Sequence, residues 1–435
     1  MGPEILTEKE LMEKKPWLNP GKWFGSPITW LPEVRATLSS MPKEVHIQET
    51  TLREGEDNAS VSFNMEQRVE IARRLSDMGV SHIDVGDIGN PLHVETLKTI
   101  MSAGVVKPPT RIQIFTRAHE VNDLNREVDK IVKYGATAIG FISWDHWDLS
   151  ESIKYCKTNY PHIYVTFGYT GTTGRVGARA PKDATMRSSF DWQIEFAKKM
   201  CEAGADRIQM SDSMGCGSPA AIRYLSTQFK EAIGPKKSLL LHAHNDYGQA
   251  VANAVAAVEA GVDWLDTAVN GLGDRAGNTA LEEVVMVLEC LYGIKTGIKL
   301  EKLYEVSKYL QEASGVRVQS YKAIVGDRVW MESGHARMLI RWKRKGVPFF
   351  EAGMETWNPQ IIGSTHELVF GKASFIPEVI KGFLEYLKLP SDENTVNKIY
   401  AAGLKQIDER IARGEDRFFT EDEVNSLCKK MAGKT

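Results

Sequence analysis

Eight short apolar runs, each followed by a longer segment with helical spacing, constrain the fold of this chain more than any other feature. Runs of this length bounded by polar turns are typical of buried parallel strands, and the longer segments predict helices between them. The expected strands are His46–Leu52, His82–Val85, Arg111–Thr116, Ala138–Ser143, Ile163–Tyr169, Arg207–Met210, Ser238–His242 and Trp264–Val269.

The helices between these runs often end at a glycine, which favours a C-terminal cap. Eight strand–helix units over about 250 residues match the size of a TIM barrel. We therefore predict an α/β fold, a (β/α)8 TIM barrel over residues 43–300. An open doubly wound sheet is the alternative, but it normally carries a glycine-rich turn after its first strand. The segment Thr50-Thr51-Leu52-Arg53-Glu54 is not such a turn.

The two flanks of the barrel differ from it. Residues 1–42 hold six prolines and three tryptophans. We expect them to form an irregular arm that packs on the body of the protein or on a partner subunit. Residues 301–435 are expected to form a smaller, mainly helical region, with helices over Leu300–Ala313, Phe375–Leu387, Glu393–Arg413 and Thr420–Met431.

Composition excludes several classes of function. The net charge of −3 among 435 residues does not predict a nucleic-acid surface. No apolar run is long enough to cross a membrane, and the N-terminus lacks the apolar core of a signal peptide. The five cysteines show no CxxC spacing, which favours a reducing compartment. We expect a cytoplasmic protein without nucleic-acid or membrane partners.

The segment Leu241-His242-Ala243-His244-Asn245-Asp246 ends one of the expected strands. Side chains alternate along an extended backbone, so His242 and His244 point the same way and can reach one ion. A buried histidine beside an exposed one is the plainer alternative. Matching chemistry at other strand ends favours a metal site.

The first strand supplies a third ligand. In a TIM barrel the active site lies at the C-terminal ends of the strands, and Glu54 follows the first of them. With His242 and His244 it makes a set of two imidazoles and one carboxylate, which suits a divalent cation with open positions. The set does not distinguish Mn²⁺, Zn²⁺, Mg²⁺ or Co²⁺. The alternative for Arg53-Glu54 is a surface ion pair.

The loop from Asn270 to Asn278 contains three glycines and leads into a helix. Such a loop lets backbone N–H groups approach an anion or an oxygen-rich ligand, although many loops share this composition.

Several segments together resemble the DRE-TIM metallolyases, and most of all their Claisen-condensing branch of 2-isopropylmalate, homocitrate and citramalate synthases. The resemblance covers roughly residues 43–375. It rests on Thr50–Glu56, His242–Asp246 and Gly271–Asn278, and it extends to Asp183–Arg187, Asp212–Pro219, Glu332–His335 and Ile361–Lys372.

The resemblance implies a role for each matching residue. Glu54, His242 and His244 would ligate a divalent metal, with Asn278 as a further ligand or a support to the ligands. Arg53 would stabilise the alkoxide that forms on the keto oxygen of a 2-oxoacid. His335, in the segment that begins at Glu332, would act as a general acid or base, supplied by the other subunit of a homodimer or higher oligomer. These roles imply an acyltransferase.

The same resemblance implies the substrates. An acyl-CoA, expected to be acetyl-CoA, would condense with the 2-oxoacid, and thioester hydrolysis would follow. Ser213 would bind the substrate carboxylate, Asp274 would line the acyl-CoA site, and Thr185 and Arg187 would contact the 2-oxoacid. From the residues alone, His146 contacts substrate or only packs. Arg117 likewise meets a substrate carboxylate or an internal acid.

Three alternatives remain. A retro-Claisen hydroxyacyl-CoA lyase would use the same barrel, but its relatives carry a cysteine in the strand-eight loop and residues 270–278 have none. A biotin-dependent carboxyltransferase would need a lysine that Gln209-Met210-Ser211-Asp212 lacks. The last alternative is a barrel without catalysis, a binding or structural subunit.

Overall fold

The computed structural model divides the chain into two compact units. It describes residues 5–116, 118, 120–143, 147–169, 172–173, 186–333 and 356–433, except for the side chains of 186–189 and 332. The first unit is Met1–Trp17 with Ser26–Arg317, and the second is Leu18–Gly25 with Val318–Thr435. No helix of the described residues has both the length and the apolar character needed to span a membrane.

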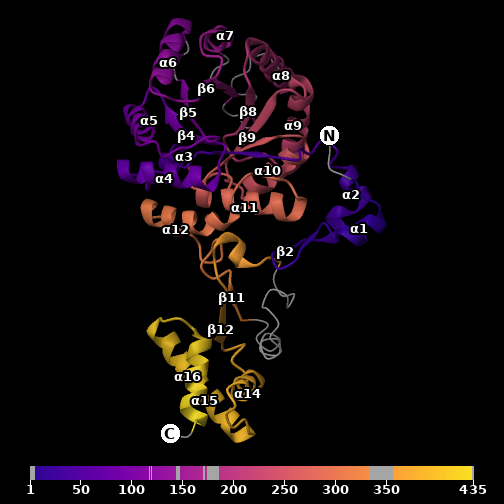
Figure 1. Cartoon of the computed structure of the whole chain (residues 1–435), viewed down its shortest axis with the longest axis vertical. Coiled ribbons are helices and arrows are strands. Elements are labelled where there is room, and N and C mark those ends of the chain that lie inside the picture. The colour runs from indigo at the N-terminus through magenta and orange to yellow at the C-terminus, as the bar shows by residue number, and fades with distance from the viewer. Residues whose placement is uncertain are drawn as a thin grey trace. The chain divides into compact units, whose positions relative to one another are not determined.

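The first unit is built on a closed barrel of eight parallel strands, as predicted. Trp264 of the last strand pairs with His46 of the first and with Leu240 of its other neighbour, so the sheet has no free edge. Figure 1 shows the helices outside the strands. The strands are β3 (His46–Glu49), β4 (His82–Asp87), β5 (Arg111–Thr116), β6 (Ala138–Ser143), β7 (Tyr164–Tyr169), β8 (Arg207–Asp212), β9 (Ser238–Ala243) and β10 (Trp264–Thr267).

The first strand ends earlier than the apolar run predicts. Residues 50–53 turn back on themselves, because the backbone N–H groups of Arg53 and Glu54 both donate to the carbonyl of Thr50, at 2.9 and 2.8 Å. A short helix, α3 (Glu54–Asp57), follows at once. Glu54 is therefore the first helical residue beyond the strand.

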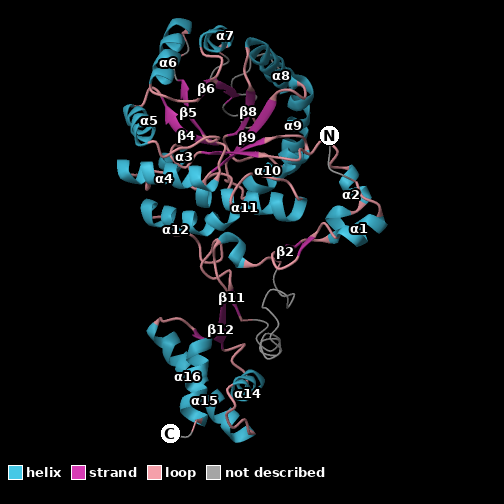
Figure 2. Ribbon diagram, viewed as in Figure 1, coloured by secondary structure: helices cyan, strands magenta, loops and turns pink. Residues whose placement is uncertain are grey.

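The outer helices begin and end where local sequence favours it. In α4, Asn64 and Gln67 form a capping box before the helix, and Gly79 closes it with φ +100°. The outer layer consists of α4 (Met65–Met78), α5 (Pro91–Ala103), α6 (Val121–Lys133), α7 (Ser150–Asn159), α8 (Met186–Ala203), α9 (Pro219–Ile233), α10 (Ala250–Glu259), α11 (Leu281–Met286) and α12 (Leu303–Ser314). Figure 2 shows their arrangement around the strands.

Arg207 lies inside the barrel at the N-terminal ends of the strands, and its side chain is completely buried. This end of the interior is called the lower layer, and the end that carries Arg53 is called the upper layer. The Nε of Arg207 donates to Thr166 Oγ1 at 3.1 Å, and its Nη2 donates to the side-chain oxygens of Gln48 and Gln113. The guanidinium carbon lies 4.3 Å from the ring centre of Trp264. The charge of Arg207 is thus surrounded by neutral hydrogen-bond acceptors and by the face of an aromatic ring.

The N-terminal arm was expected to be irregular, and this prediction is wrong for much of it. It contains α1 (Glu8–Lys14), a two-stranded hairpin of β1 (Leu18–Asn19) and β2 (Trp23–Phe24), and α2 (Pro32–Ala36). A capping box at Thr7 starts the first helix, and proline occupies the first turn of the second. These local signals stabilise short elements among the prolines.

The second unit has the predicted helices, α14 (Pro377–Tyr386), α15 (Glu393–Arg413) and α16 (Glu421–Ala432). It also has a small sheet that was not predicted, in the order β11 (Met331–Glu332), β12 (Glu367–Gly371), β13 (Phe418–Thr420). Gly403 lets α15 approach the ring of Phe375, because a Cβ atom there would lie 2.1 Å from it. The unit thus has its own apolar core.

Candidate metal centre and active site

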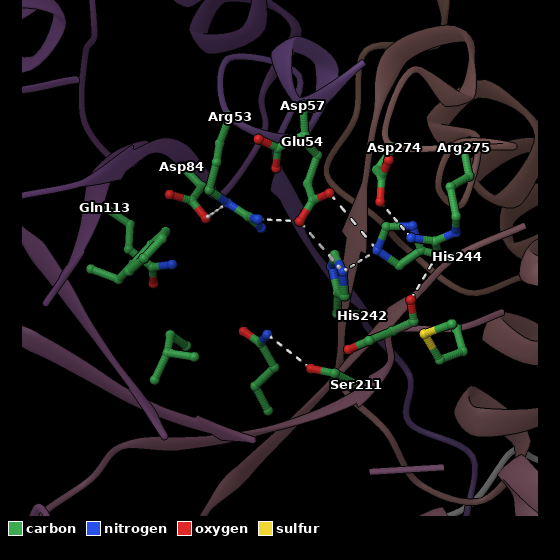
Figure 3. A pocket seen from close by; sticks show the side chains of 15 residues that line it. Arg53, Glu54, Asp57, Asp84, Gln113, Ser211, His242, His244, Asp274 and Arg275 are labelled. Carbon is green, nitrogen blue, oxygen red and sulfur yellow. Dashed lines mark hydrogen bonds and ion pairs between the residues drawn. The ribbon is translucent and has the colours of Figure 1, made fainter. Parts of the chain in front are cut away.

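A cavity of about 470 Å³ opens at the C-terminal ends of the barrel strands, where polar and apolar side chains meet (Figure 3). It is lined by Arg53, Glu54, Asp57, Asp84, Gln113, Phe115, Ile142, Gln209, Ser211, Ser213, Met214, His242, His244, Asp274 and Arg275. Six of the predicted site residues are among them: Arg53, Glu54, His242, His244, Ser213 and Asp274.

Glu54, His242 and His244 converge in this cavity although the chain separates the first from the others by almost two hundred residues. The Nε2 atom of His242 lies 3.6 Å from Glu54 Oε1, and that of His244 lies 3.8 Å from Glu54 Oε2. The two Nε2 atoms are 3.1 Å apart. All three side chains are buried, and one donor atom from each lies within 4.8 Å of the others.

Asp266 fixes the orientation of one imidazole. His242 Nδ1 and Asp266 Oδ2 are 2.8 Å apart, so Nδ1 carries the proton and donates it to the carboxylate. The Nε2 atom of His242 therefore faces His244 and Glu54. Burial would lower the pKa of His242, but Asp266 and Glu54 outweigh it and raise the pKa. A carboxylate behind a ligating histidine is the usual support of a metal site.

Arg53 lies beside the cluster and contacts three carboxylates. Its Nη1 contacts Glu54, its Nε donates to Asp84 Oδ2 at 2.8 Å, and its Nη2 lies 3.7 Å from Asp266 Oδ2. Burial alone would lower the pKa of Arg53, but these carboxylates outweigh it and raise the pKa. The guanidinium therefore keeps its charge next to the donor set.

The charges of the cluster are strongly coupled. Burial would raise the pKa of Glu54, but Arg53 and the two imidazoles hold it at about 2. Burial, together with the neighbouring His242, lowers the pKa of His244 to about 4. At neutral pH the cluster thus offers an ionised carboxylate and a neutral imidazole, the forms that bind a cation.

Asn278 lies next to the cluster, and its backbone forms a bridge with His244. Its side chain is buried, and neither amide atom has a hydrogen-bond partner. Gly273 leaves room for it, because a Cβ atom at that position would lie 2.3 Å from Asn278 Oδ1. A buried amide without partners suits a further ligand or a support to one.

A divalent cation fits these residues. Atoms that each bond an ion at about 2.0–2.2 Å must lie roughly 3–4 Å apart, and the three separations of the donor atoms fall in this range. Two imidazole nitrogens face each other and a carboxylate, and an amide without a partner lies beside them. A cation between these atoms would give each of them a partner. The donor set alone does not distinguish Mn²⁺, Zn²⁺, Mg²⁺ and Co²⁺.

The rim of the cavity carries further charges that sequence inspection missed. Arg275 donates from Nε to Asp246 Oδ1 at 2.7 Å and from Nη2 to the backbone carbonyl of Ser213 at 2.8 Å, and it also pairs with Asp274. It thereby joins the loops after β8, β9 and β10. Asp57 follows Glu54 by three residues and lies in the same cavity. Burial, with Glu54 and Asp274 nearby, raises the pKa of Asp57.

The other predicted residues cannot be placed against the cavity. Arg187 belongs to α8 and Glu332 to β11, but their side chains are not described. Arg117, His146, Thr185 and His335 lie outside the described residues. Asp266 was missed although it pairs directly with His242 across the β9–β10 ladder. The only signal in the sequence was an acidic residue inside the strand-like run Trp264–Val269.

Comparison with known proteins agrees with this geometry. Residues 44–310 match the HMGL-like family. A 2-isopropylmalate synthase of Methanocaldococcus jannaschii is 34% identical over 403 residues, which cover 90% of this chain and 74% of the relative. A homocitrate synthase of Methanopyrus kandleri is 32% identical, covering 88% of this chain and 94% of the relative.

A third relative and a solved structure complete the comparison. A putative (R)-citramalate synthase of Methanopyrus kandleri is 31% identical over 90% of this chain and 74% of its own length. The crystal structure of Bacillus subtilis HMG-CoA lyase superposes with a TM-score of 0.54 at 22% identity, over 64% of this chain and 96% of that one. That likeness concerns the fold alone. With the family matched across the whole barrel, the chain belongs to the HMGL-like family.

Proposed function

We propose that this protein is an acyltransferase that condenses an acyl-CoA, expected to be acetyl-CoA, with a 2-oxoacid and then hydrolyses the thioester. The product would be a 2-hydroxy dicarboxylate or tricarboxylate, a type of intermediate used in amino-acid biosynthesis. One observation carries the proposal: Glu54, His242 and His244 converge beside Arg53, in a chain related over nine-tenths of its length to a 2-isopropylmalate synthase.

Each described residue has a task in this reaction. Glu54, His242 and His244 would hold a divalent cation, with Asn278 beside them; when bound, the cation supplies a Lewis acid for the keto group of the 2-oxoacid. Arg53 stabilises the negative charge that develops on the keto oxygen, because its guanidinium is already fixed by Asp84 and Asp266. Asp266 keeps His242 in the tautomer whose Nε2 faces the cation.

Substrate binding is assigned to the rest of the predicted set. Ser213 on the cavity wall would bind the substrate carboxylate, and Asp274 would line the acyl-CoA site. Likeness to the condensing synthases supports contacts of Thr185 and Arg187 with the 2-oxoacid, and a role as general acid or base for His335 in the segment that begins at Glu332. We add Arg117 and His146 as substrate contacts from the sequence alone. The same likeness supports a homodimer or a higher oligomer in the cytoplasm.

A thiol-release assay tests the proposal. Purified protein loaded with Mn²⁺, Zn²⁺, Mg²⁺ or Co²⁺ is given acetyl-CoA and a panel of 2-oxoacids, and free CoA is followed with a thiol reagent. We expect turnover with at least one 2-oxoacid and none in Glu54→Gln. If the metal-loaded protein turns over no 2-oxoacid but cleaves a hydroxyacyl-CoA, the protein is a retro-Claisen lyase and the proposed direction of the reaction is wrong.

The oligomeric state is measured separately. Light scattering on the same sample is expected to give a mass of at least twice 48.6 kDa. A monomeric mass would contradict the assignment of His335 to a partner subunit.

A further inference from the structure

Arg275 ties together three loops at the mouth of the barrel. Its Nε and Nη2 donate to the two carboxylate oxygens of Asp246, at 2.7 and 3.0 Å. Its Nη2 also donates to the backbone carbonyl of Ser213 at 2.8 Å, and its Nη1 contacts Asp274. A guanidinium that pairs with both oxygens of one carboxylate is fixed in direction as well as in distance. This side chain therefore holds the loops after β8 and β9 against its own loop, which follows β10.

The backbone of Arg275 adopts a conformation that is rare for arginine. Its φ angle is +57°, in the left-handed region that glycine enters without strain and other residues seldom adopt. Gly277 in the same loop also lies in this region, with φ +84°. Strained residues cluster at functional sites, where the surrounding structure holds them in place. The contacts of the guanidinium provide such a hold, so the side chain accounts for an arginine at this position.

The loop that carries Ser213 lies directly against the residue that Arg275 binds. A Cβ atom at Gly215 would lie 2.5 Å from Asp246 Oδ2 and 2.7 Å from the backbone nitrogen of Asp246. Arg275 therefore holds this loop in two ways. It binds the Ser213 carbonyl directly, and it fixes the carboxylate against which Gly215 packs.

The neighbouring metal ligand is held by other bonds. The backbone N–H of His244 donates to the carbonyl of Asp212 at 3.2 Å, and His244 forms a backbone bridge with Asn278. Neither contact uses the side chain of Arg275. Loss of that side chain would therefore displace Ser213 without freeing the ligand.

We infer that Arg275 is a positioning residue that holds Ser213 where it binds the carboxylate of the 2-oxoacid. Ser213 lines the same cavity as the donor cluster. In Figure 3, Arg275 lies on the same side of Glu54 as His244, and Arg53 lies on the other side. A hydroxyl group held in this way binds the carboxylate equally in the substrate and in the transition state, so it lowers KM and leaves kcat nearly unchanged. This inference rests on the proposed function.

Arg275→Asn tests the role, because asparagine tolerates the left-handed backbone and removes the guanidinium. Loss of a hydrogen bond to a charged group weakens binding by about tenfold or more. We expect the KM of the 2-oxoacid with the highest kcat/KM in the panel to rise by that factor, with kcat within threefold. Bound metal, measured by plasma mass spectrometry, is expected to stay at the wild-type level. A merely structural role would lower the free energy of unfolding without this split between KM and kcat.

Asp246→Asn tests the same contact from its other end. The amide keeps the shape of the side chain but loses the charge, so KM is expected to rise here too. Residues that act through one contact are not additive, and the double variant with Arg275→Asn is expected to have the KM of Arg275→Asn alone. Increases that multiply in the double variant would show that the pair does not act as a unit.

Arg73→Asn is the matched control. Arg73 lies on α4 outside the cavity, where it donates to both oxygens of Glu70, at 2.7 and 2.6 Å, and to Asp77 at 2.6 Å. Its side chain is 41% exposed, against 35% for Arg275, and wild-type KM and kcat are expected.

Two results would overturn the inference in distinguishable ways. If Arg275→Asn keeps KM within threefold, or raises it only together with loss of bound metal, the role of Arg275 is wrong while the condensation stands. If the wild-type protein turns over no 2-oxoacid, the proposed function fails and this role fails with it.

Discussion

Two arginines in the same barrel, Arg53 largely buried and Arg207 completely buried, have opposite surroundings. Arg53, at the C-terminal end, contacts the carboxylates of Glu54, Asp84 and Asp266. Arg207, in the lower layer, has no carboxylate within ion-pair distance among the described residues; it donates to Thr166 and two glutamines and lies against Trp264. Burial lowers the pKa of Arg207, whereas the carboxylates raise that of Arg53 in spite of burial.

The difference shows what a site needs beyond a buried charge. In the lower layer, neutral oxygens of Thr166 and two glutamines accept from the guanidinium, although Arg207 Nη1 and Gln48 Nε2 have no hydrogen-bond partner among the described residues. The upper layer brings together more negative charge than Arg53 neutralises, and it leaves the amide of Asn278 without a partner. Unsatisfied polar atoms occur in both layers, so the distinguishing feature is the excess of buried carboxylates around Arg53. Buried charges are normally paired or bound to a metal, and the upper layer therefore suits a cation.

The largest expected effect comes from the ligands of the upper layer. His244→Ala removes one donor, and Lewis-acid stabilisation is worth several kcal/mol. We expect kcat/KM to fall by about 10³-fold or more, with loss of bound metal measured by plasma mass spectrometry. Undiminished metal content and activity would show that the three side chains do not share an ion.

The two arginines should then respond differently to the same change. Arg53→Lys loses the planar fork that contacts three carboxylates, so kcat is expected to fall by roughly 10²–10³-fold. Arg207→Lys leaves buried oxygens without donors and should reduce the free energy of unfolding by about 1–3 kcal/mol, with kcat within threefold. Urea unfolding and steady-state kinetics are measured on both variants. Equal losses of kcat would show that Arg53 has no catalytic role that Arg207 lacks.

Glu49, the last residue of β3, is fully buried. Burial raises its pKa to about 7 from an ordinary value of 4.5. The folded protein therefore binds more protons than the unfolded chain between these values, so stability is complete below pH 4.5 and declines as pH rises through 7. The decline is about 3 kcal/mol. In Glu49→Gln, urea unfolding across this window should show a smaller decline; an unchanged slope would assign it to other groups.

The smallest expected effect concerns the support behind the ligands. Asp266→Asn keeps the shape of the side chain but weakens its hold on His242 Nδ1. Loss of such a partner typically costs about 10–100-fold in metal affinity. Competition with a fluorescent chelator measures the Kd, and wild-type affinity would mean that the 2.8 Å contact does not orient the ligand.

Much of the barrel could be predicted from the sequence, because each buried strand is an apolar run between polar turns. The two histidines and Glu54 could also be found, since strand ends meet at one edge of a parallel barrel. Asp266 could not, because its role depends on the register that places it opposite His242. The interior position of Arg207, at the start of a strand, equally depends on tertiary packing.

The second unit shows a different limit. Its helices follow clear periodicity, but β11 and β13 have only two and three residues and pair with a strand distant in sequence. Such short strands carry no pattern of their own, and only the packed fold defines them. This is why the small sheet was not predicted.

The closure of the barrel has a consequence for synthesis of the chain. Glu54 leaves the first strand of the ring and the histidines leave the seventh, and β10 joins β9 back to β3. A nascent polypeptide that has not yet extended beyond residue 267 lacks the strand that brings these ends together. The metal site would therefore form only when the barrel closes, and the newly made protein would gain the ability to bind a cation in one step.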